Sequence, residues 1–558
     1  MKVAVIGSGL AGLTTAYLLR QQGIEVWLIE KSSKLGFHSE SVSIPLDSLK
    51  DEVEKYSRRG KGTNEKDVDG HKEKWIVDVP MRGFQGGYYP LLLSLYHHLG
   101  IPLASTNYTF SFSSNTSTYF IHSGSSGWSI PSLPSIAFTN LFTLLRDITT
   151  FLGVAFCYLL LVTLSFMAWH DILPSCVSSP DSTLREFTTQ LSIFLSKPLT
   201  IPIIDYTPWT PLGDTFEFFI GKIVLPLFSA VGTMTSADVW SMPVRIMLEY
   251  IHTTLGTNHY HLSRGFSAAD VANLLIKPVE SQGQEYVKLG TEIIGLTYNL
   301  NGGVSVGMRN GDNEPERVEI IVDKVILATQ ASVAKKLLEG LEESLKFARE
   351  EKEKRRVGEM RAALGKVSYR ETIVVTHRDT SILPSPRDRR DLNFFSPSSS
   401  SSSQHIQPSD DLIPYFPPTG DRLYTQTTQI IRPPKRKWRR RSSCMILQTT
   451  NPVVPIDPRR VLSVSKLERA LPLRQPNQIL PYLRNPSPSA CVYIVGSYAY
   501  PGIPLLEGCV GSAKLAVERI LANDPAHMSK ISGIDWDHGR GNWVARAWRW
   551  RWHKSIWG

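Results

Sequence analysis

Residues 2–12 read KVAVIGSGLAG, an apolar and β-branched run that leads directly into three glycines. The apolar run predicts a short buried strand, and Ala16 to Leu19 continue into a predicted helix that Gly23 ends. Glu25 to Ile29 then predict a second strand, which finishes at Glu30. Strand, glycine-rich turn, helix and strand, followed by an acidic residue, is the order of a dinucleotide-binding unit.

Each glycine has a mechanical role in such a unit. Gly7 permits the tight turn, Gly9 lets the backbone approach a pyrophosphate, and Gly12 lets the helix pack closely on the strand. The helix N-terminus offers unpaired N–H groups and a positive dipole end to the phosphates. Glu30, about 20 residues after the glycines, is placed to accept hydrogen bonds from the ribose hydroxyls. The predicted pyrophosphate-binding residues are Gly7, Ser8, Gly9, Leu10, Ala11 and Gly12.

The composition is that of a globular protein with more than one domain, since 558 residues exceed one compact core. The formal charge of +10 arises largely in two local segments, and no nucleic-acid motif accompanies them, so no nucleic-acid partner is expected. The five cysteines are odd in number and widely spaced, which argues against a disulfide framework and a zinc site. No signal peptide is evident at the N-terminus, and an intracellular, reducing location is expected.

The fingerprint serves both FAD and NAD, so the rest of the chain must decide between them. Residues 31–38 follow Glu30 and resemble the segment of flavin amine oxidases and phytoene desaturases that carries a basic residue and paired glycines. Lys34 stands where the family has arginine, and Phe37 replaces its second glycine. The resemblance implies that Lys31, Gly36 and Phe37 contact the cofactor.

Two later segments carry the same resemblance. Val318 to Leu327 is predicted as one strand ending in the turn of Ala328 and Thr329, and the strand near Thr291 to Ile294 matches the segment whose backbone meets the adenine. Val492 to Ser497 resembles the final strand of the family, where Gly496 precedes an acidic residue. Ser497 stands in place of that acid. Together these segments favour FAD over NAD.

Several stretches also resemble predicted FAD/NAD-binding proteins of this superfamily, including the segment that contains His377 and Asp379. Those two residues fit a catalytic role or a surface loop after a strand equally well. Tyr498 and Tyr500 could line the flavin face or simply pack. Cys509 lies near the predicted flavin-proximal helix, but its surroundings differ from the covalent-flavin segment of monoamine oxidases, so FAD is expected to be non-covalent.

The resemblance implies an α/β fold in which a Rossmann-type FAD-binding domain is interleaved with an α+β substrate domain. The FAD-binding domain is expected to comprise residues 1–107, 261–334 and 486–521, with the fold closing near Leu521. The substrate domain is expected to comprise residues 108–260 and 335–485. A Trp/Arg-rich tail at residues 522–558 is expected after the last part of the FAD-binding domain.

Other stretches predict local features. The charged residues Asp51 to Lys74 predict a surface insertion, and Glu339 to Leu364 predict one charged, solvated helix. A disordered loop is expected near residues 396–442, which contain the serine run Ser398 to Ser403 and the basic run Arg432 to Arg441. Asn107 and Asn115 begin glycosylation patterns that we interpret as chance matches.

Ile148 to Trp169 form an uncharged run of about 22 residues, long enough to cross a bilayer. A single crossing would put strands of one sheet on opposite sides of the membrane, so a buried or membrane-dipping helix is predicted instead. The tail combines tryptophans with basic residues, as interfacial anchors do, or is an uninformative extension. Contact with a membrane surface is therefore one expectation for this chain.

The resemblance implies an FAD-dependent oxidase or dehydrogenase that moves a hydride from an organic, lipophilic or amine substrate to flavin. No second GxGxxG, Ser-His-Asp signature, nucleophile elbow or metal-ligand cluster is found, and no catalytic side chain is assigned. Two alternatives remain. One is a desaturase or isomerase similar to phytoene desaturases, and the other is a non-catalytic lipid-binding protein similar to Rab escort proteins.

Overall fold

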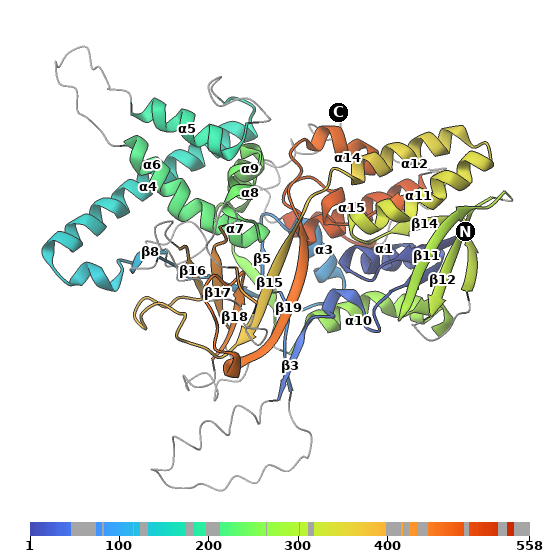
Figure 1. Ribbon diagram of the computed structural model, residues 1–558, viewed down its shortest axis with the longest axis horizontal. Coiled ribbons are helices and arrows are strands. Elements are labelled where there is room, and N and C mark those ends of the chain that lie inside the picture. Colours follow the sequence, from blue (N-terminus) through green and yellow to red (C-terminus); the bar gives the residue numbers. More distant parts are fainter. Residues whose placement is uncertain are drawn as a thin grey trace, which may run out of the picture.

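The structure is a computed structural model, shown in Figure 1. It describes residues 1–45, 74–80, 83–114, 117–122, 132–173, 182–196, 212–263, 265–300, 302–310, 317–397, 414–416, 423–431, 445–484, 490–522 and 533–540. The predicted insertion from Asp51, the runs Ser398 to Ser403 and Arg432 to Arg441, the Asn115 pattern and most of the Trp/Arg-rich tail lie outside these ranges.

A five-stranded parallel sheet forms the centre of one half of the molecule, at the right in Figure 1. Every neighbouring pair in it is parallel, as expected where helices cover both faces. Its strands, in spatial order, are β10 (Val287–Lys288), β2 (Glu25–Ile29), β1 (Lys2–Ile6), β14 (Lys324–Leu327) and β20 (Val492–Ile494). The predicted α/β fold class with a Rossmann-like sheet is confirmed.

Helices bury both faces of this sheet. One face packs against α1 (Leu10–Gln21), α3 (Pro90–His98), α10 (Ala268–Glu280) and α15 (Leu506–Leu521), where Leu13 and Leu18 are fully buried. The other face packs against α11 (Ala331–Phe347), α12 (Glu351–Leu364) and α14 (Pro476–Arg484). The sheet therefore joins strands that lie hundreds of residues apart in the chain.

The strand predicted over Val318 to Leu327 is two strands, and that prediction was wrong. β13 (Arg317–Val322) pairs antiparallel with β12 (Val304–Asn310), which pairs with β11 (Thr291–Tyr298) in a separate three-stranded sheet. β14 then enters the parallel sheet beside β1. Asp323 makes the break, because its carboxylate accepts a hydrogen bond from the Lys2 backbone N–H at 2.6 Å. The unbroken apolar pattern concealed a change of sheet.

The single helix predicted over Glu339 to Leu364 is also wrong. The chain turns at Arg349, whose φ is 59°, and α12 returns along α11. Their buried faces include Leu338 and Met360, so only the outer faces are solvated. Arg361 on α12 forms ion pairs with Glu339 and Glu342 on α11, so some of the opposite charges connect two helices.

The second half is built on a seven-stranded sheet with helices packed on one side. Its order is β19 (Val461–Ala470), β15 (Tyr369–His377), β18 (Ile446–Thr450), β17 (Gln426–Ile431), β16 (Leu392–Phe395), β7 (Phe110–Ser113) and β8 (Thr118–His122). The helices are α4 (Leu141–Trp169), α5 (Leu184–Leu195), α6 (Leu212–Phe219), α7 (Leu225–Gly232), α8 (Ser236–Trp240) and α9 (Val244–Thr254). A short π-helix, Ile220–Val224, joins α6 to α7.

Two small sheets complete the described strands. β3 (Val42–Pro45) pairs antiparallel with β4 (Lys74–Val77). β5 (Gly83–Gln85), β9 (His259–Leu262) and β6 (Leu103–Thr106) form a three-stranded sheet. Short 3-10 turns lie at Gly36–His38, Ser135–Phe138, Gln284–Tyr286, Pro458–Arg460, Ser497–Ala499 and His538–Arg540.

The predicted apolar helix over Ile148 to Trp169 begins seven residues earlier, in the longer helix α4. Asn140 caps its N-terminus, where the Thr143 N–H donates to Asn140 Oδ1 at 2.9 Å. The added turns include Arg146 and Asp147, which pair with each other at 2.8 Å. The capping box, rather than the first uncharged residue, therefore sets where the helix starts.

The fold does not close near Leu521, contrary to expectation. Residues 533–540 return to the parallel-sheet half, where Ile534 is buried in the same core as Leu92 of α3. The Gly539 N–H donates to Ser94 Oγ at 2.9 Å, and the His538 ring stacks on His97. Part of the predicted tail therefore belongs to the core.

Candidate functional site

The predicted cofactor residues gather at the carboxyl edge of the parallel sheet. Gly7 follows β1, Glu30 follows β2, Ala328 follows β14 and Gly496 closely follows β20. Because these strands are parallel and adjacent, their carboxyl ends meet at one edge, where doubly wound sheets bind ligands. The topology thus brings together residues from four separate stretches of the chain.

Gly7 and Gly12 are required by the packing itself. Gly7 has φ +102°, and a Cβ there would lie 2.6 Å from the Ala328 carbonyl oxygen. A Cβ on Gly12 would lie 1.9 Å from the Gly7 carbonyl oxygen. No larger residue fits either position without moving backbone, which explains why α1 can approach β1 and β14 so closely.

Gly9 differs from its two neighbours because the space beside it is open. It is the N-cap of α1, with φ −65° and ψ 174°, and a Cβ there would meet no atom within 4 Å. The first turn of α1 contains no acidic side chain. The helix N-terminus therefore presents free space and a positive dipole end, which is what a pyrophosphate requires.

Glu30 organises the turn around this space. Its Oε2 accepts hydrogen bonds from the Ser8 N–H at 2.8 Å and the Ser8 hydroxyl at 2.6 Å, and its Oε1 accepts one from the Ser32 N–H at 2.9 Å. The Gly36 N–H donates to Ser8 Oγ at 2.7 Å. A carboxylate offers about four lone-pair sites, so Glu30 keeps capacity for a ribose hydroxyl.

The side chains of three predicted contact residues make other contacts or are exposed to solvent. Lys31 pairs with Glu292 at 2.8 Å, although its side chain is 76% exposed. Phe37 is buried in the core with Leu10 and Ala11, and only its backbone N–H reaches the turn, donating to the Ser8 carbonyl at 3.2 Å. Ile294 is 44% exposed on β11, outside the parallel sheet. Any cofactor contact from these three would come chiefly from the backbone.

The last predicted residues lie where β20 meets α15. Gly496 has φ +152° and donates its N–H to Ser512 Oγ at 3.0 Å. Ser497 follows and reaches a large cavity. The buried Tyr498 hydroxyl, from the turn after β20, donates to the Thr329 carbonyl at 2.9 Å. The turns after β14 and β20 are therefore tied together.

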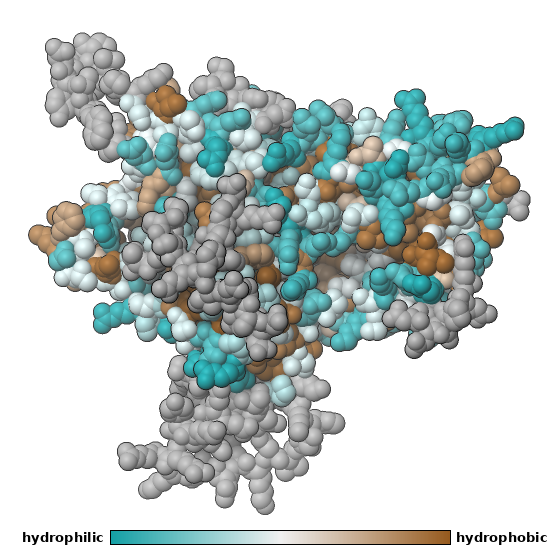
Figure 2. Space-filling model, in the orientation of Figure 1, coloured by the Kyte–Doolittle hydropathy of each residue, from teal (hydrophilic) through white to brown (hydrophobic). Residues whose placement is uncertain are grey.

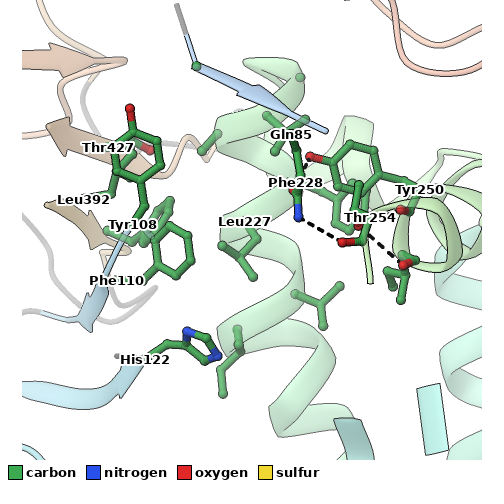
Figure 3. A pocket seen from close by; sticks show the side chains of 18 of the residues that line it. Gln85, Tyr108, Phe110, His122, Leu227, Phe228, Tyr250, Thr254, Leu392 and Thr427 are labelled. Carbon is green, nitrogen blue, oxygen red and sulfur yellow. Dashed lines mark hydrogen bonds between the residues drawn. The ribbon is translucent and has the colours of Figure 1, made fainter. Parts of the chain in front are cut away.

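The cavity has a volume of about 680 Å³ and lies between the seven-stranded sheet and the helices. Figure 3 shows Phe110, Leu392 and Thr427 on the sheet side, opposite Leu227 and Tyr250 on the helical side. The cavity also reaches Ser497, which follows β20, and Leu506 and Cys509 in the first turn of α15. It therefore connects the carboxyl edge of the parallel sheet with the second half of the molecule.

Most of the cavity wall is apolar or aromatic. Tyr108, Tyr158 and Tyr250 contribute rings, and one face of α4, including Val154 and Leu161, contributes aliphatic side chains. Figure 3 shows Gln85 fixed at one side, where its amide donates to the Thr254 carbonyl at 3.3 Å and accepts from the Tyr250 hydroxyl at 3.3 Å. Such a lining suits an apolar molecule with few polar groups.

The two histidines of the wall are neutral near pH 7. Burial lowers the pKa of His122 to about 4 and the pKa of His259 to about 4. The protonated forms would lose hydration that the apolar wall does not replace. The histidines therefore add hydrogen-bonding atoms to the cavity without adding charge.

His377 and Asp379, which the sequence left open, have structural roles. His377 is fully buried, pairs with Thr449 Oγ1 at 2.8 Å and accepts from the Asp379 N–H at 3.0 Å. Asp379 in turn accepts from Ser381 and from the Asp457 N–H. Neither residue lines the cavity, because His377 lies on the opposite face of its strand.

Tyr498 and Tyr500 also pack rather than line the cavity among the described residues. The aromatic residues that do line it, such as Tyr108 and Tyr250, were not singled out from the sequence. Alternating aromatic residues at 110, 112 and 120 were the available signal. Their significance depends on strand pairing, which the alternation alone does not show.

Comparison with known proteins finds a family similar to the first part of the chain. Residues 5–99 match a family described as an NAD(P)-binding Rossmann-like domain. This part of the chain is similar to that family and contains the end of β1, helix α1 and strand β2 of the Rossmann-like fold. Cyclohexylamine oxidase from Brevibacterium oxydans IH-35A is a solved structure with some likeness, at 10% identity and a TM-score of 0.44 over 94% of this chain and 99% of that one. No curated protein matches the sequence.

Proposed function

We propose that this chain is an FAD-dependent oxidoreductase of the flavin amine oxidase type, which transfers a hydride from a lipophilic substrate to non-covalently bound FAD. The observation that carries the proposal is the cavity that joins Ser497 and Cys509, at the cofactor edge, to an apolar interior. Cofactor edge and substrate space are thus continuous. The resemblance of residues 31–38 and 492–497 to flavin amine oxidases supports FAD over NAD.

The residues at the carboxyl edge suit the cofactor. The open space at Gly9 and the uncharged first turn of α1 would hold the pyrophosphate, and Glu30 would bind the adenosine ribose. Ala328, Thr329, Gly496 and Ser497 would hold the flavin-bearing part. When bound, FAD supplies the hydride acceptor, while the chain orients the substrate and excludes water.

The apolar wall supports a lipophilic substrate. Few side chains in it can act as an acid or base near pH 7, since burial keeps both histidines neutral and raises the pKa of Tyr250. Hydride transfer to a cofactor needs little such machinery, which agrees with this composition. A substrate that is polar along its whole length would lose hydration against the apolar wall without regaining it.

Purification of the full-length chain tests the proposal directly. The expected product is yellow, has flavin absorbance bands and releases FAD on denaturation, which is the sign of non-covalent binding. Glu30→Ala should lower FAD affinity about tenfold or more, since charge-assisted bonds contribute roughly 1.5–3 kcal/mol each. A colourless chain that binds only prenylated or other lipids would instead indicate a carrier similar to Rab escort proteins.

The outer face of α4 supports contact with a membrane surface, and we add this to the proposal. Six apolar side chains at helical spacing are exposed along it, and we call them the α4 stripe: Leu145, Ile148, Leu152, Phe156, Leu159 and Phe166. Figure 2 shows apolar residues at the left edge, over the start of α4. By length and composition α4 and residues 212–232 could each cross a membrane. The apolar part of α4 is only 33% buried, whereas that of residues 212–232 is 56% buried.

An adjacent face of α4, which includes Val154, Tyr158 and Leu161, lines the cavity, so the chain would lie along a bilayer rather than span it. Sedimentation with anionic phosphatidylserine vesicles tests this arrangement. Replacing Leu145, Leu152 and Phe156, three stripe residues that lie outside the cavity wall, with Gln should abolish co-sedimentation. The matched control replaces Leu300, Val333 and Phe347, which are exposed apolar residues elsewhere, and should sediment like the unmodified chain.

A further inference from the structure

The seven-stranded sheet forms one wall of the cavity, which we call the floor, and the two halves of this floor differ in polarity. We propose that four neutral side chains on β17 and β18, Thr427, Gln429, Gln448 and Thr450, bind the uncharged hydroxyl head of an amphipathic substrate whose apolar body lies toward α4. This polar quartet names the substrate class of the site under Proposed function and rests on that proposal.

Strand register places the four side chains together. Thr427 is directly opposite Thr450, and Gln429 is directly opposite Gln448. Residues two apart on a strand point to the same face, so the four form one patch, and all four line the cavity. The Cβ atoms of directly opposite residues lie about 4.5–5.5 Å apart, which is close enough for a single small group to touch several of the four side chains.

The two cross-strand pairs of the quartet continue into apolar residues on the next strands of the sheet. Gln429 is opposite Leu392 on β16, which is opposite Phe110 on β7. Thr427 is opposite Phe394, whose ring stacks on Phe112. The floor therefore changes from polar at β17 and β18 to aromatic at β16 and β7. The apolar end adjoins α4, since Phe112 and Leu161 share one core cluster.

Hydrogen-bonding atoms of the quartet have no partner among the described residues. They are Thr427 Oγ1, Gln429 Oε1 and Gln448 Oε1. Thr427 is 7% exposed and Gln448 only 2%, so leaving these atoms unpaired costs free energy. The Gln448 amide nitrogen donates to the Asp78 carbonyl at 3.1 Å, which leaves the carbonyl oxygen as its free end. A ligand with a hydrogen-bonding head group would satisfy these atoms.

The chemistry of the free atoms selects the head group. Two amide oxygens accept hydrogen bonds only, while the Thr427 hydroxyl can donate or accept. A hydroxyl group can donate to the former and accept from the latter. A carboxylate would lie against two amide oxygens that cannot donate to it and would have no positive side chain in the quartet. An ammonium would be buried without a counter-charge, because no Asp or Glu is among the described cavity residues.

The cation of the cavity wall lies far from the quartet. Arg469 is opposite Arg370 on β15, whereas Gln448 is opposite Thr376 on the same strand. Thr450 is opposite Val374, so four to six residues of strand, or about 13–20 Å along the backbone, separate Arg469 from the quartet. The groups that directly form the head-group site are therefore the four neutral side chains.

Calorimetry on the protein at pH 7 tests the proposal with four probes that share a ten-carbon chain: decan-1-ol, 1-methoxydecane, decan-1-amine and decanoate. Decan-1-ol should bind about tenfold more tightly than each of the others. The variant T427V/Q429L should weaken decan-1-ol binding about tenfold, the effect of one or two neutral hydrogen bonds, and leave 1-methoxydecane unchanged. Thr372→Val is the matched control, since its buried hydroxyl also has no described partner but does not line the cavity.

Each other outcome is informative. Equal binding of the amine or of decanoate would overturn the neutral head group, and unchanged decan-1-ol binding by T427V/Q429L would overturn the quartet. Loss of FAD from T427V/Q429L would assign these residues to the cofactor and also overturn it. A wild-type chain without flavin that still prefers decan-1-ol would contradict the proposed function while leaving the quartet intact.

Discussion

The cofactor edge is shaped mainly by backbone atoms, whereas the cavity is lined mainly by side chains. At the cofactor edge, Gly7 and Gly12 permit close packing of backbone, and Gly9 leaves space. The cavity is lined by side chains from separate strands and helices, such as Thr427 and Tyr250. Added atoms are therefore excluded by backbone at Gly7 and Gly12 but not at Gly9, whereas a cavity lined by side chains can change its chemistry without changing the fold.

The largest effect that would sharpen this contrast is expected at Gly12. In Gly12→Ala the new Cβ would lie 1.9 Å from the Gly7 carbonyl oxygen, and backbone must move to relieve it. We expect a loss of about 4 kcal/mol or more in the free energy of unfolding, or no folded protein. Gly9→Ala is the control and should unfold near the wild-type midpoint in urea. Equal stability of the two variants would refute the packing role of Gly12.

The next effect concerns binding rather than folding. Gly9→Val should expel FAD, because its side chain would occupy the space where the pyrophosphate is proposed to lie. Its extended backbone, with φ −65° and ψ 174°, accommodates valine, so the fold should survive. Circular dichroism recorded beside the flavin spectrum checks both points. A yellow, active Gly9→Val would remove the fingerprint from the cofactor site.

Two truncations compare the core with the end of the chain. Removing residues 533–558 deletes Ile534 and the contacts of His538 with α3, and should cost about 2–4 kcal/mol, as expected for buried side chains. Removing only residues 541–558 should leave the urea midpoint in place. Both proteins should retain FAD. Identical midpoints would show that Ile534 contributes little to the core.

The smallest effect is a pH dependence in the seven-stranded sheet. Burial lowers the pKa of His377 to about 4, whereas the unfolded residue titrates near 6.5. Between these values the unfolded chain binds the extra proton, so stability falls as the pH is lowered. At pH 5.5 this residue should cost about 1.4 kcal/mol relative to pH 7.5. His377→Gln should flatten the urea-midpoint curve in that range, and a parallel curve would contradict the burial argument.

The sequence was informative where a short stretch determines a structure locally. The strand, turn and helix from Lys2 through Gly12 follow from neighbouring residues, so the Rossmann-like sheet could be predicted. Patterns failed where an element changed partner without changing composition. Within one apolar run, Asp323 lies between a strand of one sheet and a strand of another. Within one charged run, the chain reverses direction at Arg349, so the run forms two helices.

The sequence by itself determined the dinucleotide turn, because its glycines and Glu30 lie within thirty residues and act through local backbone geometry. Only the tertiary structure decided the cavity, the role of His377 and the return of Ile534 to the core. These depend on strand register and on contacts between residues far apart in the chain, such as Gln429 beside Gln448. A period-two pattern states that a side chain has a face, but the pairing of strands decides what that face meets.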